Sequence, residues 1–108
     1  QKQTEKLPRG VYQIGITSYY GKQFHNRRTA NGEIYDMFAF TCAHRILSFG
    51  TKIKVTNLKN GKWVMVRVND RGPFVEGRIL DLSYAAAKKI GLVLTGIAKV
   101  KIEIVNKK

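Results

Sequence analysis

Hydrophobic and polar residues alternate in several short runs along the chain, a pattern typical of half-buried β-strands. Two neighbouring runs show it clearly: 51–58 carries Ile53 and Val55 between polar residues, and 62–69 carries valine at 64, 66 and 68. Asn60-Gly61 lies between the runs, and Asn-Gly favours a tight hairpin because both residues accept a positive φ. The sequence therefore predicts an antiparallel hairpin over 51–69.

A first strand and a last strand are predicted on either side of this hairpin. The stretch 11–20 alternates loosely, with Tyr12, Ile14 and Ile16 on one side. The stretch from 95 or 96 to 105 alternates lysine or glutamate with apolar residues, and its even-numbered apolar side is expected to face the core. The segment 37–47 is compatible with a short strand or with a helical turn.

A short buried strand over 79–82 and one helix complete the predicted elements. Ser83 is expected to cap the helix, which runs to about Ile90, because a serine side chain accepts a hydrogen bond from the first turn. Lys88 and Lys89 suit its C-terminal end, and Gly91 ends it. About six short strands and one helix predict a small, mainly β closed barrel.

The chain is long enough for one domain, since it has 108 residues. We expect an N-terminal tether at 1–9, the domain at 10–105 and a basic tail at 106–108. The stretch 21–36 is polar and contains several helix and strand breakers, so it is predicted to be a long ordered loop. Long ordered loops in compact domains are usually functional.

The charge is unusual, because 20 basic residues face 7 acidic ones and give a net charge of +13. Such a chain attracts nucleic acid, anionic lipid or anionic wall polymers, or uses the charge for solubility. A nucleic-acid partner is not expected, since no recognition helix or aromatic RNA-binding pattern is present. No apolar run approaches the roughly 18 residues of a membrane span, and no signal peptide is visible.

Neither a metal site nor a cofactor is predicted. Cys42 is the only cysteine, so it has no disulfide partner within the chain and is expected to be a buried thiol. The two histidines, His25 and His44, are not spaced on one helical face. The chain has no Glu-x-x-His pair and no glycine-rich phosphate loop.

The seven acidic residues provide few candidates for catalysis. Glu5, Glu76 and Glu103 are expected on the surface, Asp36 is expected to cap the next element, and Asp81 is expected to make a local hydrogen bond that braces the barrel. Two candidates for catalysis remain: Glu33, in the polar loop, and Asp70, where the second hairpin strand ends.

Asp70 is consistent with two roles, an ordinary turn residue before Gly72-Pro73 and a catalytic acid. Two effects on its carboxyl oppose each other: the nearby Arg67, Arg71 and Arg78 favour the ionised form, and burial favours the protonated form. The sequence alone does not decide between them.

Six motifs occur in one order and resemble the rare lipoprotein A (RlpA) family over about 10–105. They are SYYG at 18–21, RRTANGEIYD at 27–36, AHRILSFGT at 43–51, VTNLKNG at 55–61, VNDRGPF at 68–74 and DLSYAAAKKIG at 81–91. The resemblance implies a six-stranded double-psi β-barrel with one or two short helices, related to expansins. It differs from the usual pattern at Asn26, Cys42 and Ser48, none of which is a proposed catalytic residue.

The resemblance implies an endolytic lytic transglycosylase that cleaves the bond between N-acetylmuramic acid and N-acetylglucosamine in peptide-poor peptidoglycan and leaves 1,6-anhydro ends. By resemblance Asp70 is the catalytic acid, and Glu33 and His44 line its groove and are needed for activity. The residues expected to bind the substrate are Tyr19, Tyr20, Asn31, Arg45, Asn69 and Arg71. Trp63 is a further candidate for sugar stacking, and Tyr19, Tyr20 and Trp63 are equally compatible with packing.

The expected setting is the bacterial cell envelope, in the periplasm or at the outer membrane, with glycan strands as partner and a monomeric chain. A lipid anchor before Gln1 is compatible with the resemblance, whereas the C-terminal glycan-binding domain of many members is not found in this sequence. The alternative function is a non-catalytic, expansin-like module that binds glycans or loosens the wall.

Overall fold

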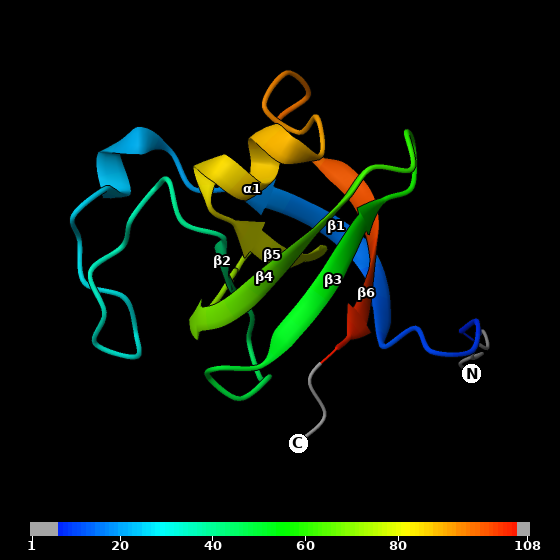
Figure 1. Cartoon of the computed structure of the whole chain (residues 1–108), viewed down its shortest axis with the longest axis horizontal. Helices are drawn as coiled ribbons and strands as arrows, with labels where there is room; N and C mark the ends of the chain where they lie inside the picture. Colours follow the sequence, from blue (N-terminus) through cyan, green and yellow to red (C-terminus); the bar gives the residue numbers. More distant parts are fainter. Residues whose placement is uncertain (1–6, 106–108) are drawn as a thin grey trace.

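The computed structural model describes residues 7–105, in which six strands close into a barrel (Figure 1). The elements in chain order are β1 (Gln13–Tyr19), the 3-10 helix η1 (Lys22–Phe24), β2 (Thr41–Ala43), β3 (Lys52–Asn57), β4 (Trp63–Asp70), β5 (Arg78–Leu82), α1 (Tyr84–Lys89) and β6 (Ala98–Ile104). The strand order around the barrel is β1-β5-β2-β4-β3-β6. Two pairs, β1 with β5 and β2 with β4, are parallel, and the other four are antiparallel. The predicted mainly β closed barrel is confirmed.

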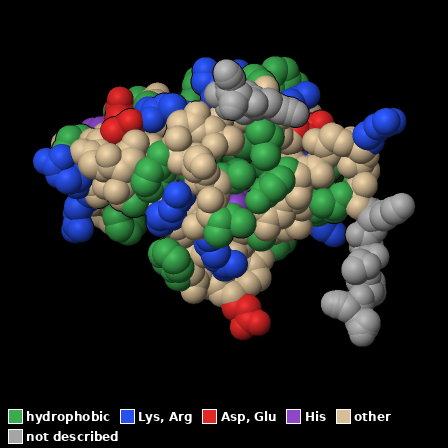
Figure 2. Space-filling model, turned by 90° about the horizontal axis from the view of Figure 1, so that it is seen from below, with side chains coloured by type: hydrophobic (Ala, Val, Ile, Leu, Met, Phe, Trp, Pro, Cys, Tyr) green, Lys and Arg blue, Asp and Glu red, His purple; other side chains and the backbone are tan. Residues whose placement is uncertain are grey.

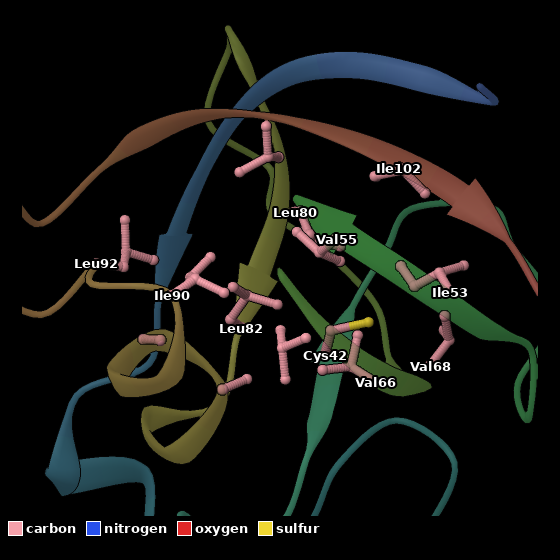
Figure 3. Packing of buried hydrophobic residues seen from close by; sticks show 14 residues of the cluster. Cys42, Ile53, Val55, Val66, Val68, Leu80, Leu82, Ile90, Leu92 and Ile102 are labelled. Carbon is pink, nitrogen blue, oxygen red and sulfur yellow. The ribbon is translucent and has the colours of Figure 1, made fainter. Parts of the chain in front are cut away.

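The barrel interior is filled by buried apolar side chains from every strand except β1, together with α1 and the segment after it (Figure 3). Val64, Val66 and Val68 of β4 are at most 2% exposed, and Val100 and Ile102 of β6 are fully buried. The expected core faces of the hairpin and of the last strand are therefore confirmed. Full burial of each such side chain contributes about 1.5–3 kcal/mol to stability, and these contacts fix the position of the end of β4.

The predicted hairpin forms, but its turn differs from the expected one. The loop 58–61 is closed by a 2.8 Å hydrogen bond from the Asn57 N–H to the Lys62 carbonyl. Only Gly61 has a positive φ, of +79°, and the prediction of a positive φ for Asn60 is wrong. The Asn60 side chain instead donates to the Ile90 carbonyl at 3.1 Å. Asn60 therefore ties the hairpin to the end of α1.

The apolar side predicted for the first strand faces outward. Ile14 pairs with Lys101 and Ile16 with Lys99 across the β1–β6 ladder, so these isoleucines lie on the outer face with the lysines. Thr17 on the inner face is fully buried, and its hydroxyl donates to the Leu80 carbonyl at 3.1 Å. At Gly15 a Cβ would lie 2.8 Å from the Ile79 side chain, so β1 packs closely against β5 with small inward residues.

The remaining elements follow the predicted capping pattern. The Ser83 hydroxyl accepts a 3.3 Å hydrogen bond from the Ala86 N–H, and Gly91, with φ of +77°, follows the helix. The ambiguous segment 37–47 contains only the short strand β2. Residues 7–9 of the predicted tether are exposed, and 1–6 and the tail 106–108 lie outside the described residues. Within 7–105, no helix has the length and apolar character needed to cross a membrane.

Candidate active site

Asp70 lies at the end of β4, where three other segments converge on it. Its Oδ1 accepts the backbone N–H groups of Ala30 at 2.9 Å and of Arg71 at 2.8 Å. Its Oδ2 accepts the hydroxyl of Tyr20 at 2.6 Å. A carboxylate offers about four acceptor positions, so one position on Oδ2 is left for a further partner. Asp70 is half-buried, which makes it a positioned carboxyl group rather than a simple turn residue.

Arg67 and Arg71, two of the three arginines near Asp70 in the sequence, are directed to other partners. Arg67 forms an ion pair with Glu33 at 2.7 Å, the only salt bridge within 4.0 Å among residues 7–105. Arg71 donates to the carbonyls of His44 at 3.1 Å and Leu47 at 2.8 Å, and its guanidinium lies 4.0 Å from the centre of the Phe49 ring. The side chains of Arg67 and Arg71 therefore do not pair with the Asp70 carboxylate.

Glu33 is held in its ionised form. Arg67 donates to both of its carboxylate oxygens, at 2.7 and 3.1 Å, and the Asn69 side chain donates to Oε1 at 3.0 Å. These bonds, from Arg67 first and then from Asn69, lower the pKa of Glu33 to about 2. The same pairing raises the pKa of Arg67. A carboxyl group with this pKa does not carry a proton at neutral pH, so Glu33 is not a proton donor there.

The predicted loop 21–36 contains the 3-10 helix η1, and its part 26–36 is fixed to the end of β4. The Asn31 N–H donates to the Asn69 carbonyl at 3.3 Å, and the Asn31 side chain accepts bonds from the Thr29 hydroxyl and the Glu33 N–H at 2.7 and 3.1 Å. In Figure 1 the loop lies beside the barrel on the side toward which β4 runs. This docking brings the Ala30 N–H onto Asp70.

Tyr20 is surrounded by aromatic rings from the same loop. Its ring centre lies 5.0 Å from that of Tyr35 and 5.6 Å from that of Phe24. Burial, followed by the hydrogen bond to Asp70, raises the pKa of Tyr20 above that of an ordinary tyrosine. Tyr20 is therefore a neutral O–H donor to Asp70, and this contact gives it a role other than the predicted sugar stacking.

His44 reaches Asp70 through its backbone and not through its ring. The His44 N–H donates to the Asp70 carbonyl at 3.1 Å. The ring Nδ1 accepts the N–H groups of Ile46 and Leu47, both at 3.2 Å, and Nε2 lies 2.8 Å from Oε1 of Gln13. Burial, with the charges of Arg71 and Arg45, lowers the pKa of His44. The imidazole is 2% exposed and braces the turn after β2.

Three other predicted residues lie away from the Asp70 carboxyl. The Tyr19 hydroxyl is 3.4 Å from the Val93 carbonyl, and its ring packs against the core. Trp63 begins β4 and Asp70 ends it, so about 24 Å of strand separates them. Arg45 donates to three carbonyls of the segment after Asp70, those of Pro73, Val75 and Arg78, at 2.7–3.2 Å.

The other described carboxylates near the barrel make the local contacts expected of them. Asp36 accepts the Phe38 N–H at 2.9 Å, and Asp81 accepts the hydroxyl of Ser18 across the β1–β5 pair. Within 7–105 no cluster of three or more His, Cys, Asp or Glu residues is placed to hold a metal ion. The Nδ1 of His25 accepts the Met37 N–H at 3.1 Å.

Sequence reasoning missed two partners of the site. One is the Ala30 N–H, a backbone donor that no residue type reveals. The other is Gln13, whose side chain bonds His44. Gln13 lies on a strand whose pattern predicts only alternation, so the sequence carries no signal for this contact.

Residues 12–102 match the protein-family model described as "Lytic transglycolase". The chain is 57% identical over 101 residues to the endolytic peptidoglycan transglycosylase RlpA of Vibrio cholerae, an alignment that covers 94% of this chain and 38% of that protein. It is 54% identical over 95 residues to the RlpA of Pseudomonas aeruginosa strain PA14, covering 88% and 28% of the two chains. The chain thus spans only 28–38% of the length of these two relatives.

Solved structures share the fold at lower identity. A Streptomyces papain inhibitor superposes with a TM-score of 0.69 at 21% identity, covering 94% of this chain and all of that one. An expansin from Clavibacter michiganensis superposes with a TM-score of 0.68 at 23% identity, covering 88% of this chain and 50% of that one.

Proposed function

This chain belongs to the RlpA family of lytic transglycosylase domains with the double-psi β-barrel fold, and from this membership we propose that it cleaves peptidoglycan glycan strands. The bond would be the one between N-acetylmuramic acid and N-acetylglucosamine in peptide-poor strands, and the product would carry a 1,6-anhydro end. The observation that carries the proposal is the Asp70 carboxyl group, with three fixed donors and one acceptor position left on Oδ2.

Asp70 would act first as a general acid and then as a base. Its proton passes to the glycosidic oxygen as the bond from that oxygen to the anomeric carbon breaks. The C6 hydroxyl oxygen of the same muramic acid forms the new bond to the anomeric carbon, and its proton passes to the Asp70 carboxylate. Protons balance and no water is consumed, so the second carboxylate of ordinary glycosidases is not required.

The three donors of Asp70 would stabilise the carboxylate that forms during proton transfer. Two of them are backbone N–H groups and the third is the Tyr20 hydroxyl, and all are in place before reaction. Donors that are preorganised around a developing charge lower the barrier because no reorganisation is needed. We assign Tyr20 as a positioning residue for Asp70.

Glu33 and His44 would also act by positioning. Glu33 is ionised and bonds Arg67 and Asn69, and it holds the loop whose Ala30 N–H reaches Asp70. His44 holds the turn whose backbone N–H reaches the Asp70 carbonyl. Four other residues would hold the same loops in place through their bonds to backbone and side chains, and we propose that they also contact the sugar directly: Asn31, Arg45, Asn69 and Arg71.

Mass analysis of the products from peptide-free glycan strands tests the proposal. The wild-type chain is expected to give 1,6-anhydro ends. Asp70→Asn, which keeps the size of the side chain, should give none while melting within a few degrees of the wild type. If the wild-type chain binds the strands but leaves them intact, the result supports the non-catalytic, expansin-like alternative. If Asp70→Asn is fully active, Asp70 is not the catalytic acid.

The proposed substrate also sets the location and the partner. Peptidoglycan lies in the bacterial cell envelope, so the domain would act there after export, in the periplasm or at the outer membrane, as a monomer. The relatives named above are peptidoglycan transglycosylases. Size measurement in solution would test the monomeric state.

A further inference from the structure

Two surface hollows meet at Phe40, beside the loop that carries Glu33. The larger, of about 420 Å³, lies between this segment and α1 and is lined by Phe38, Phe40, Tyr84, Ala85, Lys88 and Lys89. The smaller, of about 260 Å³, lies over β3 and β4 and is lined by Phe40, Lys52, Met65, Val66 and Arg67. We call the two together the Phe40 trough.

The Phe40 ring stands in the trough on a fixed backbone. Phe40 is 47% exposed and Phe38 is 67% exposed, although aromatic side chains usually bury most of their surface. The Phe40 carbonyl accepts the Arg67 N–H at 3.2 Å, and the neighbouring Ala39 carbonyl accepts the Ser83 hydroxyl at 2.7 Å. A rigid scaffold therefore presents an exposed aromatic face, as sugar-binding surfaces require.

The charged groups that line the trough are all basic. Lys88 and Lys89 line the larger hollow, Lys52 and Arg67 line the smaller one, and no Asp or Glu lines either. The Lys89 ammonium lies 5.8 Å from the centre of the Phe40 ring. On the face of the molecule that Figure 2 shows, basic and hydrophobic side chains lie interspersed and acidic ones are fewer. The trough therefore complements a ligand that has both an apolar face and a negative charge.

Arg67 connects the trough to the loop that carries Glu33. This arginine lines the smaller hollow and also bonds Glu33. Arg67 and Asp70 are three positions apart on β4, which corresponds to about 10 Å along the strand. A glycan strand of a few sugars is therefore long enough to reach from the trough to Asp70.

We propose that the Phe40 trough binds the part of the glycan strand that flanks the cleaved bond and recognises the lactyl carboxylate of a muramic acid. Every muramic acid carries a lactyl group, whose carboxyl is ionised when no peptide is attached. One sugar face stacks on Phe40, and the carboxylate lies near Lys88 and Lys89. The inference rests on the proposed function, since it places the same substrate in a second contact region.

Binding to the uncleavable Asp70→Asn chain tests the proposal without catalysis. The probes are peptide-free peptidoglycan oligosaccharides and chitin oligosaccharides of equal length, which have the same sugar backbone but no lactyl carboxylate. Titration calorimetry at low salt should show about tenfold tighter binding of the peptidoglycan probe, as two exposed ion pairs would give.

The double variant Lys88→Gln with Lys89→Gln should reduce this preference to about twofold or less, because the two positive charges that attract the carboxylate are removed. Phe40→Ser should weaken the binding of both probes by about tenfold, since the stacking of a sugar face on the Phe40 ring is lost in each case. The matched control is Lys59→Gln with Lys62→Gln, which removes two exposed lysines at the hairpin and should leave the preference unchanged.

An unchanged preference in the Lys88/Lys89 variant overturns the inference, as does equal binding of both probes by the parent chain. These outcomes are separate from failure of the proposed function. If the wild-type chain releases anhydro ends but the variants keep the preference, only the trough assignment fails. If no anhydro ends form while binding depends on the trough, only the proposed cleavage fails.

Discussion

The hydroxyl of Tyr20 lies 2.6 Å from Oδ2 of Asp70 and joins the segment after β1 to the end of β4. The two residues are 50 positions apart in the chain. Because burial keeps Tyr20 neutral, its O–H is a fixed donor to the only carboxyl oxygen that has an acceptor position left. The proposed proton transfer therefore takes place at a carboxyl group that the Tyr20 hydroxyl holds in position.

Replacing Tyr20 by phenylalanine should lower cleavage more than binding. The ring and its packing against Tyr35 remain, but the donor to Oδ2 is lost. We expect a fall of about 10- to 100-fold in turnover with little change in glycan affinity, as for loss of a positioning contact. Rates of anhydro-end formation and glycan affinities measure the two effects.

Tyr19→Phe is the matched control for this change. It removes a hydroxyl from the adjacent residue, whose O–H contacts the Val93 carbonyl at 3.4 Å, away from Asp70. Its turnover and glycan affinity should stay close to those of the wild type. Equal losses in the two variants would show that a general loss of stability, and not the bond to Asp70, explains the effect.

The ion pair of Glu33 with Arg67 should make stability depend on pH in the acidic range. The pKa of Glu33 is lowered from 4.5 to about 2 in the folded chain. The stabilisation is therefore present above pH 4.5 and is lost as the pH falls toward 2. Since the two side chains are 40% and 38% exposed, water screens them, and we expect about 1 kcal/mol. Denaturant unfolding of wild type and Glu33→Gln from pH 2 to 6 measures the difference.

Asp36→Asn provides the comparison in the same loop, because Asp36 contacts the Phe38 N–H and not an arginine. An asparagine can accept the same bond. The gap in unfolding free energy between wild type and Glu33→Gln should close near pH 2, whereas Asp36→Asn should follow the wild type throughout. A gap that is constant with pH would contradict the assignment.

The site was predictable from sequence where a residue type carries its own chemistry. Asp70 and Glu33 could be selected because the other carboxylates had surface, capping or bracing roles, and the capping contact of Asp36 and bracing contact of Asp81 are confirmed. The partners of Asp70 were not predictable in the same way. Two are backbone N–H groups, and the third depends on a contact between residues 50 positions apart.

The fold shows the same division between local and distant information. The hairpin, the capped helix and the core face of β6 follow from periods of two and 3.6 residues and from capping chemistry. The parallel pairings β1–β5 and β2–β4 join strands that are not neighbours in the chain, and alternation does not specify a partner strand. The crossing pattern came from the family resemblance. The outward side of β1 was not anticipated either, because its small inward residues left the isoleucines facing the lysines of β6.

Replacing Arg45 by lysine should loosen the segment that follows Asp70. The guanidinium of Arg45 bonds the carbonyls of Pro73, Val75 and Arg78 at once, and a single ammonium cannot match this fork. Since Arg45 is exposed, we expect a loss of about 1 kcal/mol in stability. Hydrogen exchange should show faster exchange at amides within 74–78. Arg27→Lys, at another exposed arginine, should leave those amides unchanged, and equal protection in both variants would remove this role from Arg45.

His44 should make the chain less stable as the pH falls below the pKa of an ordinary histidine. Burial and the charges of Arg71 and Arg45 lower its pKa from 6.5 in the folded chain. The unfolded chain therefore binds the proton first, and stability falls as the pH drops below 6.5. His44→Asn cannot titrate, yet its side-chain oxygen can still accept bonds from the Ile46 and Leu47 N–H groups. Unfolding by denaturant from pH 5 to 8 should show a steeper loss at low pH in the wild type than in the variant. His25 is present in both chains and cancels in the comparison, so parallel curves would mean that His44 does not supply this pH dependence.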